Sequence, residues 1–366
     1  MKVAIVHEWL TIYGGSERVT EIFHEIFPEA PIYCLVYDEE TMPDRFKNYD
    51  IRPTFVQKLP FAKKKYKAYL PIMPRAYEEL DLTEYDLVIS SSSACAKGVI
   101  TRSDAMHICY CHTPTRYLWE FYYEYVKNMG KLKKIIISMF IHKLRIWDRL
   151  AADRVDKFVA NSNYISGRIF KYYRKQSKVI FPPVNTHLYN ISDINENYYL
   201  IVSRLVTYKR VDLAIEAFNK LNLPLIIVGD GPEAEKLKKM ANSNIKFLGR
   251  LSDEEIRTYY SKCKAFVFPG EEDFGITPVE AQASGRPVIA YGKGGALDTV
   301  IDNKTGVFFY KQTVDSLITA IERFELNGVE YTNNEIKAYS EKFSVDRFKE
   351  EFTNYLKLNV DNFNCR

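Results

Sequence analysis

The sequence has no apolar run long enough to cross a membrane. The longest candidate, residues 135–141, is interrupted by Ser138 and falls far short of the roughly 18 residues that a spanning helix needs. The apolar start at residues 1–6 is cut short by His7 and Glu8, which is too little for a secretory core. We therefore expect a protein that is soluble or lies on a membrane surface without crossing it.

Cysteine is scarce and follows no recognisable framework. The six cysteines are Cys34, Cys95, Cys109, Cys111, Cys263 and Cys365. Their spacing matches no disulfide scaffold, so a reducing cytoplasm is the simpler expectation. Cys109, Cys111 and His112 lie close together, but no second ligand pair with zinc spacing accompanies them. Alternation along a strand places both thiols on one face, where we expect small buried cysteines and no metal.

A strong net charge of either sign is also missing. Lys and Arg number 51 and Asp and Glu number 47, a difference of 51 − 47 = 4. This excess is too small to argue for nucleic acid, and no recognised nucleic-acid-binding module accompanies it. We expect no nucleic acid partner. With 366 residues, of which 46% are hydrophobic, the chain is instead long enough for two globular domains.

The sequence does contain a regular alternation of short apolar strands and helices. The expected strands cover residues 2–7, 86–92, 106–111, 157–160, 179–181, 199–203, 225–228, 245–248 and 265–268. The expected helices run from a cap at Ser16 to about residue 27 and over residues 211–221, 233–241 and 253–261. This alternation predicts an α/β fold with parallel sheets and right-handed crossovers.

Two adjacent prolines divide the chain. Pro182 and Pro183 continue neither a strand nor a helix, so we expect a domain boundary there. Residues 1–183 then form one α/β domain and residues 184–344 a second. The tail, residues 345–366, begins with an amphipathic helix over residues 345–358. Its apolar side carries Phe348, Phe352 and Tyr355.

The stretch 268–281 combines the end of a buried strand, a glycine-bearing loop and the start of a helix. Thr277 is a good N-cap residue, and Pro278 follows where the first helical turn tolerates proline. Backbone N–H groups of the loop then lie at a helix N-terminus, where a phosphate or sugar oxygen is held. These groups belong to Phe274, Gly275 and Ile276.

Two carboxylates bracket this loop. Glu272 and Glu280 are separated by seven residues. However, Thr277 followed three positions later by Glu280 is also the pattern of a capping box, in which the glutamate only bonds back to the cap residue. Spacing alone therefore leaves two interpretations of Glu280 open, a ligand contact and a helix cap.

The second half begins with a basic loop. Arg204 follows the first strand of that half and Lys209 precedes the next helix, at the edge where an open α/β sheet binds ligands. Two cations at this place neutralise a diphosphate. The sequence lacks Asp-x-Asp, the usual carboxylate pair for a metal that bridges a nucleotide-sugar diphosphate. An exposed basic turn is the alternative interpretation, and Arg210 is able to replace or assist Lys209.

The first half offers further candidates for ligand contact. Gly14 and Gly15 follow the first strand, where a glycine pair lets the backbone approach a ligand, although a full G-x-G-x-x-G motif is absent. His112 stands beyond the carboxyl end of a strand, and Arg116 is a candidate for acceptor or phosphate contact. His7, at the end of the first strand, is a weaker candidate. A plain turn at the glycines and a core or capping role for His112 are the alternatives.

Taken in order, these motifs resemble the retaining GT-B glycosyltransferases of glycosyltransferase family four. The resemblance covers nearly the whole chain, including the first glycine loop and residues 90–93, 111–117, 204–209, 229–233, 272–280 and 285–288. It implies two Rossmann-like, doubly wound domains that face a cleft. Residues 1–183 would be the acceptor-side domain and residues 184–344 the nucleotide-sugar-binding domain. The tail 345–366 would cross back to the first domain.

The resemblance also implies residue roles. Arg204 and Lys209 are the phosphate clamp, helped by the amides of residues 274–276. Glu272 engages the donor sugar and Glu280 the ribose hydroxyls of the nucleotide. His112 contacts the sugar near the anomeric carbon, and the first glycine loop faces the diphosphate. No metal and no cofactor are expected, since the nucleotide sugar is a co-substrate.

Within the family, residues 111–119 and 203–213 look most like bacterial mannosyltransferases of O-antigen and exopolysaccharide assembly, which use GDP-mannose. The resemblance therefore implies a retaining, metal-independent hexosyltransferase that moves mannose to a hydroxyl of a glycan or lipid-linked acceptor. Two alternatives share the architecture: a nucleotide-sugar epimerase and a non-catalytic sugar-nucleotide-binding partner subunit.

Two segments of the first half mix basic residues with apolar and aromatic ones. Residues 58–69 include Lys63, Lys64, Lys65 and Lys67 beside Phe61, Tyr66 and Tyr69. Residues 131–149 combine Lys131, Lys133, Lys134, Lys143 and Arg145 with Ile135, Ile136, Ile137, Met139, Phe140 and Trp147. This composition suits a surface on anionic lipid headgroups, although a solvated helix face is the alternative. We expect a lipid-linked or anionic acceptor and a cytoplasmic protein, peripheral on the inner face of the cell membrane.

Overall fold

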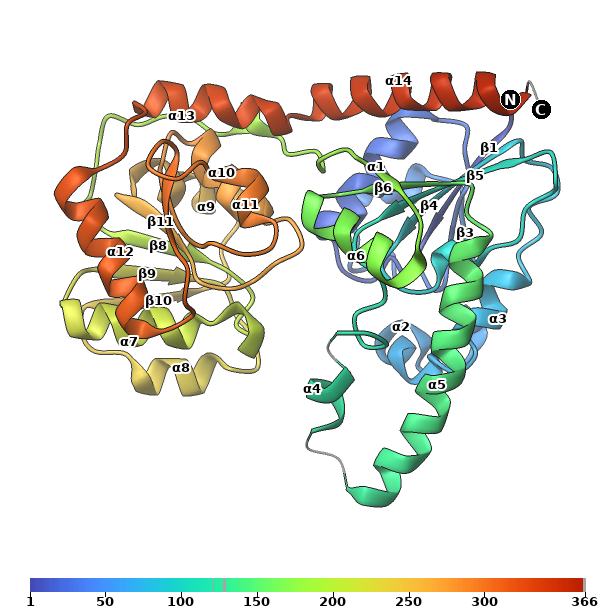
Figure 1. Cartoon of the computed structure of the whole chain (residues 1–366), viewed down its shortest axis with the longest axis horizontal. Helices are drawn as coiled ribbons and strands as arrows, with labels where there is room; N and C mark the ends of the chain where they lie inside the picture. The colour runs from blue at the N-terminus through green and yellow to red at the C-terminus, as the bar shows by residue number, and fades with distance from the viewer. Residues whose placement is uncertain (121, 128–129, 365–366) are drawn as a thin grey trace. The chain divides into compact units, whose positions relative to one another are not determined.

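The computed structural model describes residues 1–120, 122–127 and 130–364, except for the side chains of residues 124, 125, 131–133, 136, 361, 362 and 364. The chain divides into two compact units (Figure 1). The first consists of Met1–Phe181 with Lys349–Arg366, and the second of Pro182–Phe348. Among the described residues, no helix is long and apolar enough to cross a membrane.

The first unit is built on a seven-stranded parallel sheet of order β3-β2-β1-β4-β5-β6-β7. Its strands are β1 (Val3–His7), β2 (Ile32–Cys34), β3 (Ile51–Pro53), β4 (Leu87–Ser92), β5 (Met106–Cys111), β6 (Lys157–Ala160) and β7 (Ser177–Val179). Its α-helices are α1 (Gly15–Ile26), α2 (Ala62–Lys65), α3 (Met73–Glu78), α4 (Tyr122–Val126), α5 (Lys131–Asp153) and α6 (Asn163–Tyr173). The strand order reverses between β1 and β4, and such a switch point is where α/β sheets bind ligands.

The core of the first unit explains why its central strands read as apolar runs. β1, β4 and β5 are buried along their whole length, as expected for a parallel sheet covered on both faces. On one face, Phe23 of α1 packs against Tyr110 of β5 and Phe352 of α14 (Val345–Asn364), with ring centroids 5.7 and 4.6 Å apart. The C-terminal helix thus completes the core of this unit.

The second unit is built on a six-stranded parallel sheet of order β10-β9-β8-β11-β12-β13. Its strands are β8 (Tyr199–Val202), β9 (Leu225–Val228), β10 (Ile245–Gly249), β11 (Ala265–Phe268), β12 (Val288–Tyr291) and β13 (Gly306–Phe309). Its helices are α7 (Val211–Leu221), α8 (Ala234–Met240), α9 (Asp253–Lys262), α10 (Ile276–Ala283), α11 (Ala296–Thr299), α12 (Val314–Asn327) and α13 (Asn333–Ser340).

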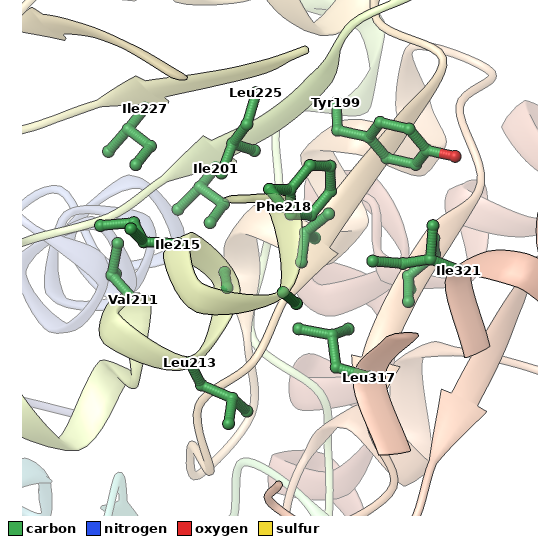
Figure 2. Packing of buried hydrophobic residues seen from close by; sticks show 14 of the residues in the cluster. Tyr199, Ile201, Val211, Leu213, Ile215, Phe218, Leu225, Ile227, Leu317 and Ile321 are labelled. Carbon is green, nitrogen blue, oxygen red and sulfur yellow. The ribbon is translucent and has the colours of Figure 1, made fainter. Parts of the chain in front are cut away.

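Helices cover both faces of the second sheet. On one face, side chains of α7 and α12 such as Phe218 and Ile321 pack against Tyr199 and Ile201 of β8 (Figure 2). On the other face, a second cluster joins α9, α10 and α11 to the sheet. Both units are therefore doubly wound α/β domains, and the predicted pair of Rossmann-like domains is confirmed.

The predicted strands and helices agree with the structure in part. Val211–Leu221, Leu225–Val228 and Ala265–Phe268 begin and end where predicted. The strand predicted over residues 179–181 lies earlier, at Ser177–Val179, because the pairing of β7 with β6 starts at Ser177. β2, β3, β12 and β13 have no counterpart among the predicted ranges. β2 and β3 have only three residues each, which is too short for a periodic signal.

Candidate active site

The second unit brings the loops after β8, β11 and β12 to one edge of its sheet. All its strands run parallel, so their carboxyl ends meet there. β8 lies between β9 and β11 in the strand order, which makes the β8–β11 boundary the switch point of this sheet. The loop after β8 carries Arg204 and Lys209, and the loop after β11 carries Glu272.

Lys209 and Glu272 form an ion pair across this switch point. The lysine Nζ contacts Glu272 Oε1, and the two side chains are only 17% and 20% exposed. Partial burial makes such a pair stronger than an exposed one, since less water screens it. The structure therefore joins two of the predicted site residues, which the sequence places on separate motifs.

Arg204 and Arg210 differ from Lys209. The Arg204 side chain is exposed at the end of β8, and no described residue forms a hydrogen bond or ion pair with its guanidinium. Arg210 instead contacts Asp212 at 3.2 Å and donates to Gln312 Oε1 at 3.2 Å. Arg210 is therefore paired with residues that were not predicted as site residues, whereas Lys209 pairs with Glu272, which was.

The helix after the Glu272 loop starts two residues earlier than the sequence pattern suggests. α10 begins at Ile276, with Gly275 as its N-cap at φ +93° and without a side-chain cap. Thr277 lies inside the first turn, so the predicted Thr277 cap is wrong. Gly275 takes the position because its left-handed backbone strains any residue with a Cβ. Phe274 and Ile276 flank this cap, and the first amides of α10 have no carbonyl partner within the helix.

Glu280 is not part of a capping box, because Thr277 is not the N-cap. Its buried carboxylate accepts a hydrogen bond from the Tyr260 hydroxyl, with Oε2 at 3.0 Å. Burial, together with the charge of Glu280, raises the pKa of Tyr260 well above its usual value, so Tyr260 stays a donor. One side of the Glu280 carboxylate is thus fixed from the interior of the second unit.

The loop after β12 packs directly on the Glu272 loop. Gly295 N–H donates to the Glu272 carbonyl at 2.8 Å. A Cβ at Gly295 would lie 2.2 Å from Phe274 Cα, so only glycine permits this approach. The glycine-rich sequence 292–295 therefore fixes the position of the loop that carries Glu272.

In the first unit, His112 lies directly after β5 and bonds to the neighbouring strand β4. Its Nε2 is 2.8 Å from Ser91 Oγ, and its carbonyl accepts from Asn161 at 3.0 Å. The side chain is half-buried. Burial, with a smaller contribution from nearby His7, lowers the pKa of His112 to about 3. His112 is therefore a neutral imidazole at pH 7.

His7 also contacts Ser91 and belongs to a buried polar network that includes His112. The sequence pattern did not predict this network. Its Nδ1 is 3.1 Å from Ser91 Oγ and 2.9 Å from Thr20 Oγ1, and its Nε2 is 3.2 Å from Glu17 Oε1. His7, Glu17, Thr20 and Ser91 are all buried. A polar residue in a fully buried central strand, such as Ser91, needs a hydrogen-bond partner. That requirement is the sequence signal that could have pointed to this network.

The other candidates of the first half are Gly14, Gly15 and Arg116. Gly14 is the N-cap of α1, which begins at Gly15, so the predicted cap at Ser16 is wrong. Ser16 instead donates its hydroxyl hydrogen to Glu17 Oε1 at 2.9 Å. Arg116 is half-buried in the loop after β5. The structure thus brings His7 and His112 together through Ser91.

Glu8, the residue after His7, fills an anion-binding loop of the chain itself. The buried carboxylate accepts from Ser92 Oγ at 2.9 Å and from the amides of Ser93 at 3.0 Å, Ala94 at 2.6 Å, Cys95 at 3.0 Å and Ala96 at 3.2 Å. A ring of amides like this one resembles a phosphate site. Because Glu8 occupies it, the ring serves to fix the loop that follows Ser91 and Ser92.

The cysteines pack as small core residues. Cys109 and Cys111 are buried in one apolar cluster with residues of α6, as the strand alternation predicts. Cys365 lies outside the described residues. Within the described parts of the chain, no three His, Cys, Asp or Glu side chains are grouped to hold a metal ion.

Comparison with known families covers both halves of the chain. The model described as "Glycosyltransferase Family 4" matches residues 13–188, and the model described as "Glycosyl transferases group 1" matches residues 190–343. The chain belongs to glycosyltransferase family 4. The family resemblance predicted from the motifs is therefore confirmed.

Curated relatives of this chain include mannosyltransferases. An uncharacterized glycosyltransferase of Methanocaldococcus jannaschii is 31% identical over 56% of the chain and 60% of its own length. The O-antigen chain mannosyltransferase C of Escherichia coli is 26% identical over 55% and 60%. A GDP-mannose-dependent alpha-mannosyltransferase of Corynebacterium glutamicum is 38% identical over 31% and 28%. The matched part of the chain spans three-fifths or less of these relatives.

Solved structures agree on the fold of this chain. The structure of HepE from Anabaena in complex with UDP covers 98% of the chain and 100% of its own, with a TM-score of 0.70 at 16% identity. Sucrose-phosphate synthase from Thermosynechococcus elongatus covers 99% and 100%, with a TM-score of 0.77 at 16% identity. At this identity the likeness shows the fold alone, which is GT-B.

Proposed function

We propose that this glycosyltransferase moves mannose from GDP-mannose to a hydroxyl of a glycan or lipid-linked acceptor in cell-surface polysaccharide synthesis. The transfer is retaining and independent of a metal. The observation that carries the proposal is the half-buried ion pair of Lys209 and Glu272 beside the N-terminus of α10. The choice of donor is supported by the names of the mannosyltransferase relatives.

The cations of the second unit suit a diphosphate leaving group. Lys209 is held by Glu272, and Arg204 is exposed at the end of β8 with its charge accessible to a ligand. Positive groups placed where charge develops stabilise the transition state without later rearrangement. In the proposal, Lys209, Arg204 and the amides of residues 274–276 hold the leaving diphosphate in place of a divalent ion.

The proposed reaction takes place on one face of the sugar. The bond from the anomeric carbon to the phosphate oxygen breaks, and the acceptor oxygen bonds to the same face. The departing phosphate takes the acceptor proton, so no carboxylate nucleophile is needed. Two contacts support this choice: Glu272 is paired with Lys209, and Glu280 accepts from buried Tyr260. Two carboxylates committed in this way do not fit a two-carboxylate glycosidase mechanism.

The proposal gives the remaining candidate residues the roles that the family resemblance implies. Glu272 orients the sugar hydroxyls while it holds Lys209, and Glu280 binds the ribose. His112 contacts the sugar, and its neutral imidazole suits a hydroxyl partner. The loop with Gly14 and Gly15 serves the diphosphate, and Arg116 serves the acceptor.

Donor binding tests the proposal directly. GDP and GDP-mannose are expected to raise the midpoint of thermal unfolding more than UDP, ADP and their sugars. A ligand at 100 times its Kd stabilises by about 2.7 kcal/mol. Differential scanning calorimetry with each nucleotide measures this shift. Chelator is expected to change neither the shift nor the turnover, because the proposed charges come from Lys209, Arg204 and helix amides.

Three outcomes would contradict the proposal. Loss of turnover with chelator and its recovery with manganese would show that a metal carries the diphosphate. Incubation of GDP-mannose without any acceptor separates transfer from epimerisation, since an epimerase converts the sugar nucleotide and a transferase only hydrolyses it slowly. Tight nucleotide binding with no turnover on any acceptor would point to a non-catalytic subunit.

We also propose that the first unit rests on an anionic membrane surface, through α5 and residues 58–69. Ile141 and Leu144 of α5 join the core, but four apolar residues of the helix remain more than half exposed. These are Ile135, Met139, Ile146 and Leu150. Their spacing of four, seven and four positions places them on one side of the helix. The side chains of Lys131, Lys133 and Ile136 lie outside the described residues.

The second basic segment adds charge to the same unit. Residues 58–69 form short helical turns that expose Phe61 and several lysines. Lys65 Nζ lies 5.4 Å from the centre of the Phe61 ring. The exposed lysines of this segment are Lys58, Lys63, Lys64, Lys65 and Lys67. An exposed aromatic ring among lysines matches the mixed apolar and anionic chemistry of a lipid headgroup layer.

Replacing Met139 and Ile146 together with glutamate is expected to reduce binding to phosphatidylglycerol-containing vesicles by at least about tenfold. The change removes apolar contact and places negative charge against anionic lipid, where each basic residue contributes about 1 kcal/mol. Vesicle sedimentation measures the bound fraction. Leu326→Glu, at an exposed position of the second unit, is the control. Equal binding of the double variant and the unchanged chain, or equal binding to neutral vesicles, would contradict the membrane surface.

A further inference from the structure

Polar side chains connect the Glu17 carboxylate to His112 through the interior of the first unit. Glu17 Oε1 is 3.2 Å from His7 Nε2, and His7 Nδ1 is 3.1 Å from Ser91 Oγ. Ser91 Oγ is in turn 2.8 Å from His112 Nε2. His7, Ser91 and His112 lie on or directly after β1, β4 and β5, which are neighbours in the sheet. Strand order therefore brings His7, Ser91 and His112 together, and Glu17 reaches His7 from helix α1.

The Glu17 end of this chain determines which groups donate. Burial alone would raise the pKa of the Glu17 carboxyl, but its hydrogen bonds, the one with His7 foremost, outweigh burial, and the pKa lies below its usual value. Glu17 is therefore a carboxylate, which only accepts. The proton of His7 that faces it must sit on Nε2. In the Nε2–H tautomer, His7 then accepts at Nδ1.

The direction of the remaining bonds follows from the other partners. Thr20 is able to donate its hydroxyl hydrogen to the Ser16 carbonyl at 3.1 Å, a bond common within helices. Thr20 also lies 2.9 Å from His7 Nδ1 and 3.1 Å from Ser91 Oγ. When it donates to Ser16, Ser91 donates to His7 Nδ1 and accepts from His112, which places the His112 proton on Nε2. No described residue bonds to His112 Nδ1, and the side chain is half-buried. Nδ1 is therefore the nitrogen that remains for a ligand.

We propose that Glu17, acting through His7 and Ser91, is a positioning residue that holds His112 in its Nε2–H tautomer, with Nδ1 as an acceptor for a hydroxyl of the donor sugar. The hydroxyl partner rests on the proposed function, but the tautomer does not. A histidine fixed in the other tautomer would present an N–H to the ligand and would require an acceptor there. Glu17 thus decides what kind of sugar group His112 recognises.

Nitrogen NMR of the full chain tests the tautomer without any substrate. In ¹⁵N-histidine-labelled protein, long-range ¹H–¹⁵N correlation spectra distinguish the two tautomers, and His112→Asn identifies the signals of His112. The expected result at pH 7.5 is the Nε2–H pattern. In Glu17→Gln, the side-chain amide donates to His7 Nε2, which reverses the chain and shifts His112 toward Nδ1–H. An Nδ1–H pattern in the unchanged protein, or no change in Glu17→Gln, would overturn the proposal.

Turnover provides the second readout. Glu17→Gln is expected to lower kcat on the order of tenfold, since a hydrogen bond to a charged group is lost and His112 presents the wrong nitrogen. Adding Glu17→Gln to Ser91→Ala should cause little further loss, because Ser91 is the only described link between His7 and His112. Independent, multiplicative losses would contradict the link.

A control separates this effect from a general loss of structure. Glu25→Gln also neutralises a carboxylate of α1, but Glu25 pairs with Lys349 at 2.6 Å on the surface. It is expected to change neither kcat nor the His112 spectrum. Because the NMR measurement needs no donor, failure to find turnover with GDP-mannose would leave the tautomer test intact. A correct tautomer with no mannosyl transfer would instead count against the proposed function.

Discussion

Replacing Lys209 with methionine is expected to lower kcat by about 10²- to 10³-fold, the loss typical when one stabilising group of a preorganised charged site is removed. Methionine keeps much of the side-chain volume but removes the charge that the proposed mechanism places on the leaving diphosphate. It also leaves the partly buried Glu272 without its counter-charge. Initial rates with saturating GDP-mannose measure the effect on kcat.

The matched control is Lys220→Met, on α7 of the same unit. Lys220 pairs with Asp315 at 3.4 Å, and both side chains are largely exposed, so the pair contributes little. This variant should retain turnover within about twofold. If Lys209→Met also stayed within that range, the diphosphate would not be held by the loop after β8. The proposed metal-independent mechanism would then lack its main cation.

Replacing Asp148 with alanine is expected to destabilise the first unit by about 3–5 kcal/mol, the cost of leaving one partner of a buried pair alone. Asp148 Oδ1 lies 2.5 Å from Lys97 Nζ, with both side chains buried. Burial alone would lower the pKa of Lys97, but the charge of Asp148 outweighs it and holds that pKa well above its usual value. The variant removes this counter-charge and leaves Lys97 buried without it, which is costly whether the amine stays charged or loses its proton.

Asp148 also holds three neighbours of the buried pair. Its carboxylate accepts from Thr115 at 2.7 Å, Trp119 at 2.8 Å and Tyr173 at 2.9 Å. Loss of Asp148 therefore leaves several buried donors without a partner, which adds to the cost. These contacts tie α5 to the loop after β5 and to α6.

Tryptophan fluorescence isolates the expected effect. Trp9, Trp119 and Trp147 are the three tryptophans of the chain, and all belong to the first unit. Urea unfolding followed at these residues therefore reports that unit. Asp153→Ala, which removes a more exposed pair with Arg149, should cost less than about 1 kcal/mol.

A double variant separates the cost of an unpaired buried charge at Lys97 from the cost of lost packing at Asp148. Lys97→Met with Asp148→Leu removes both charges, and such replacements often restore stability. We expect the double variant to be more stable than Asp148→Ala. Equal stability of Asp148→Ala and the unchanged protein would contradict the role of the buried pair.

The candidate site was predictable where it depends on local sequence. A strand end followed by a loop and a helix start is a local pattern, so Lys209, Glu272 and Glu280 were found from their spacing. Local patterns also misled. Thr277 and Ser16 are good cap residues by type, but Gly275 and Gly14 hold those positions. Backbone approach and strand geometry decided these helix starts, and neither is visible in residue type.

The polar network of the first unit was not predictable in the same way. His7 appeared as a weak candidate, and Glu17 and Thr20 as ordinary residues of a helix. Thr20 and Ser91 are 71 residues apart in the chain, yet their hydroxyl oxygens lie 3.1 Å apart. No periodicity or motif connects two positions at that separation.

The sequence by itself determined that the chain alternates strands and helices, forms two Rossmann-like domains and carries its charged loops at the carboxyl ends of strands. These properties follow from short-range periodicity and turn chemistry. Only the tertiary structure decided which side chains meet: Lys209 with Glu272, Glu280 with Tyr260, and His112 with Ser91. The physical reason is strand order, because a crossover connection makes neighbours of strands that are distant in the chain.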